Sequence, residues 1–264
     1  MVLVGGGMAL AGWFNGRVPG LRALCISLGC AGLGGGEEAA EPVSDVGAPH
    51  RVALQCPAGT APGPATDVAF EGAVCVRPDG VPQGPMVAWW SDGTKEREGA
   101  WVEGRQDGPW KLYDREGRVN HEGHFRLGNR IGEWRSTMLG LPMEQGSYDD
   151  EGRKDGPWTS WWPKAGSPIW RRVTYRAGLG VGPWEAWHPN GQASEAGTLV
   201  DGRFEGEWSR WAEDGTLIER GQYRGDAPVG AWTWFKPDGS VERSCDFDDP
   251  AASAGCEAPS PPGP

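Results

Sequence analysis

The sequence has few histidines and fewer basic than acidic residues. Its 264 residues include four histidines, and 25 lysines and arginines stand against 36 aspartates and glutamates, for a net charge of −11. Nucleic acids and anionic lipid surfaces bind basic footprints. The charge therefore excludes both as main partners, and a membrane is expected as a contact only through a covalent anchor.

Helical periodicity and long hydrophobic runs are also missing. No apolar pattern with a period of 3.6 residues persists within residues 84–247, and proline stands next to most of the glycines that recur there. Because proline breaks the interior of a helix, α-helical repeats are excluded. The apolar run at residues 23–30 is too short to span a bilayer.

The motifs of catalysis and metal binding are absent as well. The sequence contains no Gly-x-Ser-x-Gly elbow and no phosphate-binding loop. His121 and His124 stand three residues apart on an expected strand, hence on opposite faces, which is poor geometry for a metal. The glycine-rich stretch 178–182 precedes no helix and is expected to be a turn of a repeat. We therefore expect no enzymatic activity, no catalytic residues, no cofactor and no metal site.

Glycine and tryptophan, by contrast, are abundant and regularly spaced. The chain has 44 glycines and 16 tryptophans, and one phrase, Gly-x-Trp, recurs at steps of 24, 24, 24, 26, 24 and 24 residues. A fixed period in this range indicates a repeat array. The phrases open at Gly84 (where Met86 replaces the tryptophan), Gly108, Gly132, Gly156, Gly182, Gly206 and Gly230.

Each repeat is predicted to be one β-hairpin. Residues 108–113 are strand-like and aromatic, residues 114–117 form a turn that ends in glycine, and residues 118–127 form a second strand. Asp-Gly and Asn-Gly pairs mark the same turn in other repeats. The predicted fold is all-β: an elongated single antiparallel meander sheet of about seven 24-residue hairpin repeats, spanning residues 84–247.

Equivalent positions of stacked hairpins line up in columns. The first column holds the Gly-x-Trp tryptophans, Trp110, Trp134, Trp158, Trp184, Trp208 and Trp232. The second lies three residues further on and holds Trp89, Tyr113, Trp161, Trp187, Trp211 and Phe235. Strand side chains alternate, so the two columns should face opposite sides unless a bulge intervenes. A single sheet has no second layer, so we expect the first column to provide the core. The second, reinforced by Trp90, Trp162 and Trp234, is the candidate binding surface.

The segments outside the array have compositions of their own. Residues 1–36 resemble a bacterial lipoprotein signal, in which Cys30 after Gly29 would carry the lipid; a cleaved secretion signal and a misplaced start before a cytosolic protein are the alternatives. Residues 37–52 are predicted to be a flexible linker, residues 53–83 an N-terminal cap with a partial repeat, and residues 248–264 a disordered proline-rich tail.

Four cysteines remain once Cys25 and Cys30 are assigned to the targeting segment. In an exported chain an even number suggests disulfides, with three possible connectivities. Cys75 and Cys245 occupy the repeat position otherwise held by glycine, at the two ends of the array. This register favours the local pairs Cys56–Cys75 and Cys245–Cys256, each holding a cap on one end. Four free thiols in a cytosolic protein are the alternative.

The repeated phrase "Gly-x-Trp-x-x-Trp/Tyr, Asp-Gly, then Gly-x-Tyr/Phe" resembles the MORN repeat, and more closely the bacterial MORN-variant repeat that is associated with antitoxins. The resemblance covers about residues 72–247. The opening 56–60 with Cys75 also resembles exported proteins of this variant type. The resemblance implies an array of β-hairpins with a protein-binding or scaffolding role and no catalytic residues.

These observations together favour a non-enzymatic scaffold or binding protein of the bacterial cell envelope, in the periplasm or outer membrane, with a protein as its partner. Two alternatives remain open. The second aromatic column could bind a glycan or peptidoglycan, because sugar rings stack on tryptophan, or the chain could be a cytosolic antitoxin-like protein that neutralises a partner protein.

Overall fold

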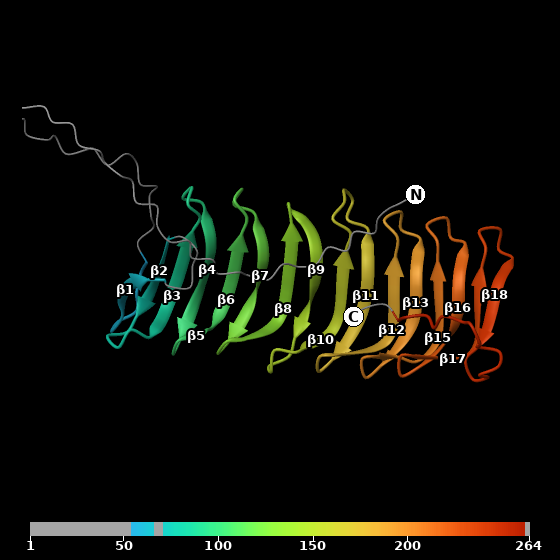
Figure 1. Cartoon of the computed structure of the whole chain (residues 1–264). Coiled ribbons are helices and arrows are strands. Elements are labelled where there is room, and N and C mark those ends of the chain that lie inside the picture. The colour runs from blue at the N-terminus through green and yellow to red at the C-terminus, as the bar shows by residue number, and fades with distance from the viewer. Residues whose placement is uncertain (1–53, 66–70, 262–264) are drawn as a thin grey trace, which may run out of the picture. The chain divides into compact units, whose positions relative to one another are not determined.

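The structure, a computed structural model, describes residues 54–65 and 71–261. Within these residues every regular element is a β-strand, and eighteen strands form one antiparallel sheet in which each strand pairs with its neighbours along the chain (Figure 1). The predicted all-β meander is confirmed.

The strands follow one another in chain order. They are β1 (Ala61–Pro64), β2 (Glu71–Val76), β3 (Pro82–Trp89), β4 (Lys95–Val102), β5 (Arg105–Gln106), β6 (Gly108–Tyr113), β7 (Val119–Arg126), β8 (Asn129–Met138), β9 (Leu141–Tyr148), β10 (Lys154–Trp161), β11 (Ile169–Arg176), β12 (Leu179–Trp187), β13 (Ala193–Val200), β14 (Arg203–Phe204), β15 (Gly206–Trp211), β16 (Leu217–Arg224), β17 (Ala227–Phe235) and β18 (Val241–Asp246).

The seven sequence repeats correspond to seven hairpins. These are β3–β4, β6–β7, β8–β9, β10–β11, β12–β13, β15–β16 and β17–β18. The short strands β5 and β14 continue into β6 and β15 after a single residue, so each of these pairs forms one interrupted strand. The two irregular repeats also behave as expected. The shortened third repeat turns tightly at Leu139 and Gly140, both with positive φ, and the insertion in the fourth repeat lies between β10 and β11.

The hairpin turns are closed by glycine and an acidic or amide side chain. In the turn after β6, the Gly117 N–H donates to the carbonyl of Asp114 at 3.0 Å, and Gly117 has a φ of 77°. The Asp114 carboxylate also accepts from the backbone N–H of Arg118 at 2.8 Å. Glycine supplies the left-handed conformation and the short acidic side chain replaces a backbone acceptor, so the sequence signal for these turns has a direct physical cause.

The opening glycine of every repeat stands in a left-handed conformation. All seven have positive φ, from 59° at Gly230 to 115° at Gly84. In β10 the pairing with β9 loses register between Asp155 and Thr159, around the phrase that begins at Gly156. A bulge of this kind requires a residue without a Cβ. The Gly-x-Trp phrase therefore marks a kink in the strand that redirects the tryptophan.

The redirected tryptophan lies over a glycine of the preceding strand. A Cβ added to Gly146 would lie 2.1 Å from the Trp158 indole, and one added to Gly197 would lie 2.7 Å from Trp208. No side chain fits in that space, so glycine is required there for contact and not for φ. The five glycines covered in this way are Gly99, Gly123, Gly146, Gly197 and Gly221.

In four repeats the indole N–H ties the tryptophan to the same preceding strand. Trp134 donates to the carbonyl of His124 at 3.1 Å, and Trp232 donates to the carbonyl of Gln222 at 3.0 Å. Both bonds end on the residue after the covered glycine. A buried indole that keeps its hydrogen bond avoids the cost of desolvating an unpaired donor, so these four tryptophans fix the spacing of neighbouring strands.

An aromatic ladder in two runs, from Trp101 to Tyr175 and from Trp184 to Trp234, supplies the core that a second layer would otherwise provide. The six Gly-x-Trp tryptophans are between 0% and 6% exposed, which confirms their predicted structural role. From Trp101 to Tyr175 they alternate edge-to-face with the aromatic side chains of the return strands, at centroid distances of 5.0 to 6.3 Å. Edge-to-face pairs are each worth about 0.5–1.5 kcal/mol beyond the area they bury.

Both ends of the sheet carry a disulfide, with the predicted pairing. Cys56 bonds Cys75 across 19 residues, and Cys245 bonds Cys256 across 11 residues. Cys75 and Cys245 are themselves buried, at the register position that glycine holds elsewhere. Loops of these lengths stabilise a fold by about 3 kcal/mol each when the bond is unstrained.

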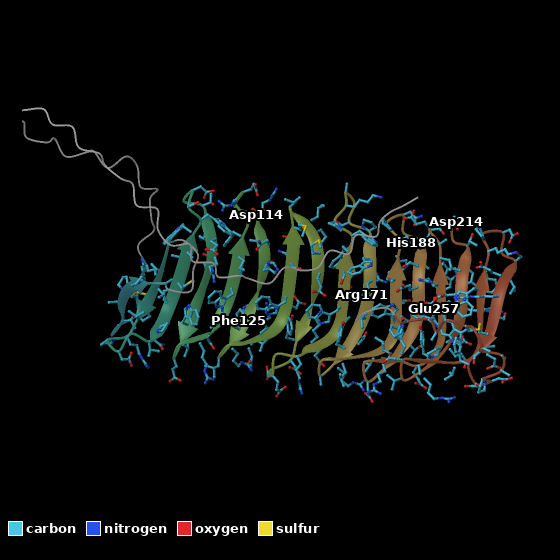
Figure 2. The ribbon with its side chains drawn as sticks, viewed as in Figure 1. Asp114, Phe125, Arg171, His188, Asp214 and Glu257 are labelled. Atoms are coloured by element: carbon cyan, nitrogen blue, oxygen red, sulfur yellow. A yellow bond between two sulfur atoms is a disulfide. The ribbon has the colours of Figure 1, made fainter. Side chains whose placement is uncertain are left out.

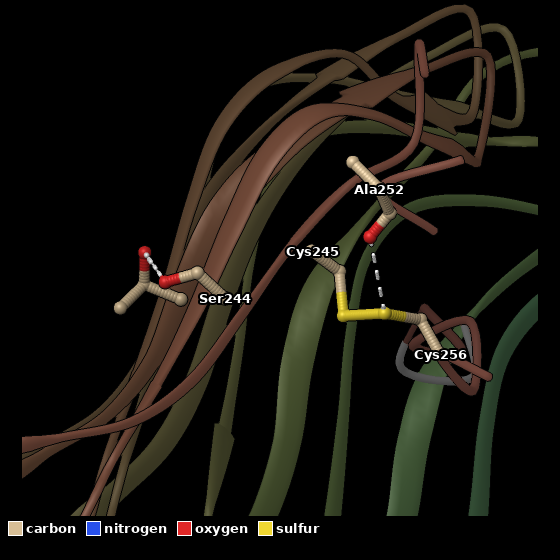
Figure 3. The surroundings of a disulfide bond; sticks show 5 residues. Ser244, Cys245, Ala252 and Cys256 are labelled. Atoms are coloured by element: carbon tan, nitrogen blue, oxygen red, sulfur yellow. Dashed lines mark hydrogen bonds between the residues drawn. A yellow bond between two sulfur atoms is a disulfide. The ribbon is translucent and has the colours of Figure 1, made fainter. Parts of the chain in front are cut away.

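The C-terminal segment differs from the expectation of disorder. The structure places residues 248–261, which begin with turns after β18 and run back along the sheet toward β12 (Figures 1 and 2). Cys256 packs against the core cluster that includes Trp232 and Cys245. The disulfide, shown in Figure 3, holds this segment in place. The targeting segment with Cys30 and the linker 37–52 lie outside the described residues.

Substituting a covered glycine should destabilise the sheet strongly. In Gly123→Ala the new methyl group would lie 2.2 Å from the Trp134 indole, and overpacking of this kind costs about 1–3 kcal/mol. We expect the free energy of unfolding, measured by tryptophan fluorescence in urea, to fall by about 2 kcal/mol. His124→Ala is the matched control, because it changes the next residue on the other face. Equal stability of both variants would contradict the packing described.

Candidate binding surfaces

The second aromatic column lies on the face opposite the ladder. In each hairpin the register shift before these residues comes from an extra residue in the return strand, as where Ala88 pairs with Arg97 but Trp89 pairs with Lys95. Alternation along the first strand is therefore unbroken, and positions three apart point to opposite sides. All six side chains are half-buried: Trp89, Tyr113, Trp161, Trp187, Trp211 and Phe235. We call this side of the sheet the column face.

Cations flank the rings of this column. The Lys95 ammonium lies 5.5 Å from the Tyr113 ring centre, the Arg172 guanidinium 5.4 Å from Trp187, and the Arg220 guanidinium 5.7 Å from Phe235. At these distances a cation is attracted by the ring face. Each of the three aromatic residues thus has a hydrogen-bond donor beside its apolar surface.

The first member of the column lines a cleft. Trp89 borders a space of about 680 Å³ together with Lys95, Glu98 and Lys111. Glu98 pairs with Lys95 at 2.7 Å and accepts a hydrogen bond from the Tyr113 hydroxyl. Burial raises the pKa of Tyr113, and its bond to Glu98 adds to the rise. Aromatic surface and paired charges meet here in a solvent-accessible position.

The tryptophans next to the column in sequence have other roles. The Trp162 indole N–H donates to the carbonyl of Trp187 at 2.9 Å, one repeat further on. The His188 ring nitrogen bonds the carbonyl of Trp211 at 2.8 Å in the same way. Trp234 is on the ladder face, where it is 8% exposed and donates to Glu219. The expectation that Trp234 enlarges the binding column was therefore wrong, whereas Trp162 is half-buried and connects two repeats.

A row of charged residues on the ladder face was missed by sequence reasoning. Two positions before each covered glycine or its replacement stand Arg97, His121, Glu144, Arg171, Glu195, Glu219 and Arg243. Near the C-terminal end Glu219 is buried and accepts from Arg210 at 3.0 Å and from the Trp234 indole at 2.9 Å. The sequence signal for this row is that each member stands two residues before a covered glycine or its replacement. A search for known motifs does not detect such a spacing.

Glu195 is the electrostatically strained member of this row. Burial raises the pKa of its carboxyl, and the Glu219 carboxylate adds to the rise, while the Trp184 indole N–H, Arg210 and His188 oppose it. Two carboxylates therefore flank the single guanidinium of Arg210. The ionised form of Glu195 is held in place at a cost in stability.

The pKa of Glu195 predicts a pH dependence of stability. Because the folded-state pKa lies above the ordinary value of 4.5, the folded chain binds the proton more tightly, so stability is lost as the pH rises through this window. Glu195→Gln should flatten the decline in the urea midpoint as the pH rises above 4.5. Glu133→Gln, on the exposed column face, is the control. A decline of unchanged steepness in Glu195→Gln would contradict this assignment.

Other expectations about chemistry concern histidines and metals. His121 and His124 line different clefts, one with Trp110 and Phe125 on the ladder face and one with Lys111 on the column face, so they do not converge. Within residues 54–65 and 71–261, no group of three or more histidine, cysteine, aspartate or glutamate side chains could hold a metal ion. In the same residues no helix is long and apolar enough to cross a membrane.

The family described as MORN repeat variant matches residues 204–224, which hold Phe204 of β14, all of β15 and all of β16. No curated protein matches the chain. The matched unit contains Trp208, which lies over Gly197 of the preceding strand, and the turn at Gly215, and the other hairpins repeat its opening glycine with positive φ. The match therefore supports the resemblance to MORN repeats, which suggests a repeat scaffold or binding role for the sheet.

Proposed function

We propose that this chain is a non-enzymatic, exported binding protein that holds a protein partner on the column face of its sheet. The proposal rests on the difference between the two faces of the sheet. The ladder face uses its aromatic side chains to form the core. The column face carries a second row of aromatic side chains, half-buried and flanked by cations, that the core does not need.

The chemistry of the column face suits a protein partner. Tyrosine, tryptophan and arginine supply most of the binding energy at protein interfaces. Trp187 and Trp211 stand at equivalent positions of neighbouring repeats, with exposed Arg172 and Arg220 on the return strands of the same face. An array that repeats such a pair presents a long surface rather than a pocket.

An exported location is supported by the two disulfides. Disulfides persist in oxidising compartments and are rare in the cytosol of most organisms. We propose lipid anchoring at Cys30, which lies outside the described residues, because the sequence before it resembles a lipoprotein signal.

Removal of the column tryptophans should abolish partner binding. We expect Trp187→Ala combined with Trp211→Ala to reduce recovery of the bound partner at least tenfold, as measured by quantitative affinity capture from the cell envelope; this corresponds to about 1.4 kcal/mol or more. Leu139→Ala is the control, because this side chain is 72% exposed in a turn. Full recovery with the double variant would refute the column face as the interface.

Glycan binding is the second candidate. It is favoured by the same exposed ring faces with neighbouring donors, an arrangement on which sugar rings stack. Pull-down with purified peptidoglycan and a glycan array distinguishes the two candidates. Binding that is lost in Trp187→Ala with Trp211→Ala would favour glycan recognition, and absence of binding to both materials would refute glycan recognition.

The antitoxin-like alternative makes a different prediction. It would be favoured if the protein is found in the cytosol with all four array-flanking cysteines reduced.

Lipidation has a direct test. Radiolabelled palmitate should enter the wild-type chain and not Cys30→Ala, because the thiol of that cysteine is the acceptor. The measurement is labelling in the native cell followed by gel separation. Equal labelling of both chains, or none in the wild type, would refute the anchor and leave the binding proposal to its own test.

A further inference from the structure

The position two residues before the opening glycine differs in one repeat. In three repeats it carries a side chain that lies against the indole. Arg130 lies 4.7 Å from Trp134 and Lys154 lies 3.8 Å from Trp158, while Phe204 meets Trp208 edge-on at 5.2 Å. In β12 this position is Gly180, against which the Leu199 side chain packs, and the Trp184 ring is contacted instead by the Arg171 guanidinium at 4.9 Å.

A cleft of about 370 Å³ lies beside Gly180. Its walls include Tyr175, Trp184, Leu199 and Phe204, with Gly180 at the same opening. Gly180 itself is buried and has no positive φ. The expectation that residues 178–182 form only a turn was therefore wrong for Gly180, which lies inside β12 and packs against the Leu199 side chain.

A proline from the chain's own C-terminal segment lies at this cleft. Pro261 is one of its lining residues, although 81 positions separate it from Gly180 in the sequence. Glu257 of the same segment lies over this part of the sheet in Figure 2. Proline-rich segments favour an extended polyproline conformation, and grooves lined by aromatic residues bind them because little entropy is lost.

The second disulfide sets the reach of this segment. Cys245 lies on β18, and the cleft lies roughly three to five strand spacings away, or about 14–24 Å. From Cys256 to Pro261 there are five further residues, which span at most about 17 Å, and the bond joins two Cα atoms 6.4 Å apart. The segment after the disulfide is therefore long enough to reach the cleft and too short to move far from it.

We propose that the Gly180 cleft is a binding site for proline-rich peptide and that the C-terminal segment, through Pro261, is its intramolecular ligand. The disulfide keeps this ligand at a high effective concentration, on the order of millimolar for a short tether. A proline-rich segment from another chain binds this site only if it displaces the C-terminal segment. This site lies on the ladder face and is independent of the proposed partner surface.

A peptide added in trans tests the proposal. The probe is a fluorescein-labelled peptide with the sequence of residues 257–264, and the protein is the chain ended after Cys256. We expect saturable binding by fluorescence polarisation, at least tenfold weaker binding to the full chain, and loss of binding when the four prolines of the peptide are replaced by alanine. Failure of the shortened chain to bind the peptide while correctly folded would overturn the proposal.

Filling the cleft provides the matched variants. Gly180→Lys introduces the side chain that Lys154 supplies in the preceding repeat, and the nearest obstacle is the end of the Leu199 side chain. Gln106→Lys makes the same kind of change at the equivalent position of another repeat. In the shortened chain, Gly180→Lys should abolish peptide binding and Gln106→Lys should preserve it. Equal binding by the two variants would contradict the assignment of the site.

The full chain offers a second measurement that does not depend on shortening it. The {1H}-15N heteronuclear NOE of the Ser260 amide should fall in Gly180→Lys and remain unchanged in Gln106→Lys, because only the former expels the tail. An unchanged NOE in Gly180→Lys would show that the tail does not use the cleft.

Discussion

The contact between an indole and a bare glycine backbone is the interaction on which this sheet depends. A single layer of strands has no opposing layer against which to bury its apolar side chains. Here the tryptophans of five repeats lie flat over a glycine of the preceding strand, and four of them donate the indole N–H to the next carbonyl. Two glycines serve each contact for different reasons: the opening glycine accepts the left-handed bulge, and the covered glycine leaves room for the ring. The core is thus built within one layer.

Because the core is formed on one face of the sheet, the side chains of the opposite face are not needed for it. The ladder face carries the buried rings and a row of charged side chains, among which Glu195, Arg210 and Glu219 are balanced at a cost. The column face carries aromatic side chains that are half-buried and paired with cations. A scaffold or binding role requires a surface like the column face. The regular register of the repeats places its aromatic side chains at nearly constant spacing along the sheet.

The 24-residue period made most of the fold predictable. Hairpin boundaries, the opposite facing of the two columns and the pairing of Cys56 with Cys75 and Cys245 with Cys256 all follow from register, because a single fixed step determines which residues are neighbours. The charged row was not predicted, since charged side chains at variable positions look like solvated surface until the sheet places them side by side. The cleft at Gly180 could not be read from sequence either. One glycine among many looks like a turn, and its meaning depends on what Lys154 and Phe204 do at the equivalent positions.

The central claim, that indole rings lie flat on glycine backbones along the sheet, can be measured directly by NMR. A proton above an aromatic ring is shifted upfield, and the hypothetical Cβ positions of Gly99, Gly123, Gly146, Gly197 and Gly221 place one Hα of each against an indole. We predict strong upfield shifts for one Hα of these five glycines and ordinary shifts for opening glycines such as Gly108 and Gly156, which have open space around them. Ordinary shifts at all five covered glycines would contradict the account.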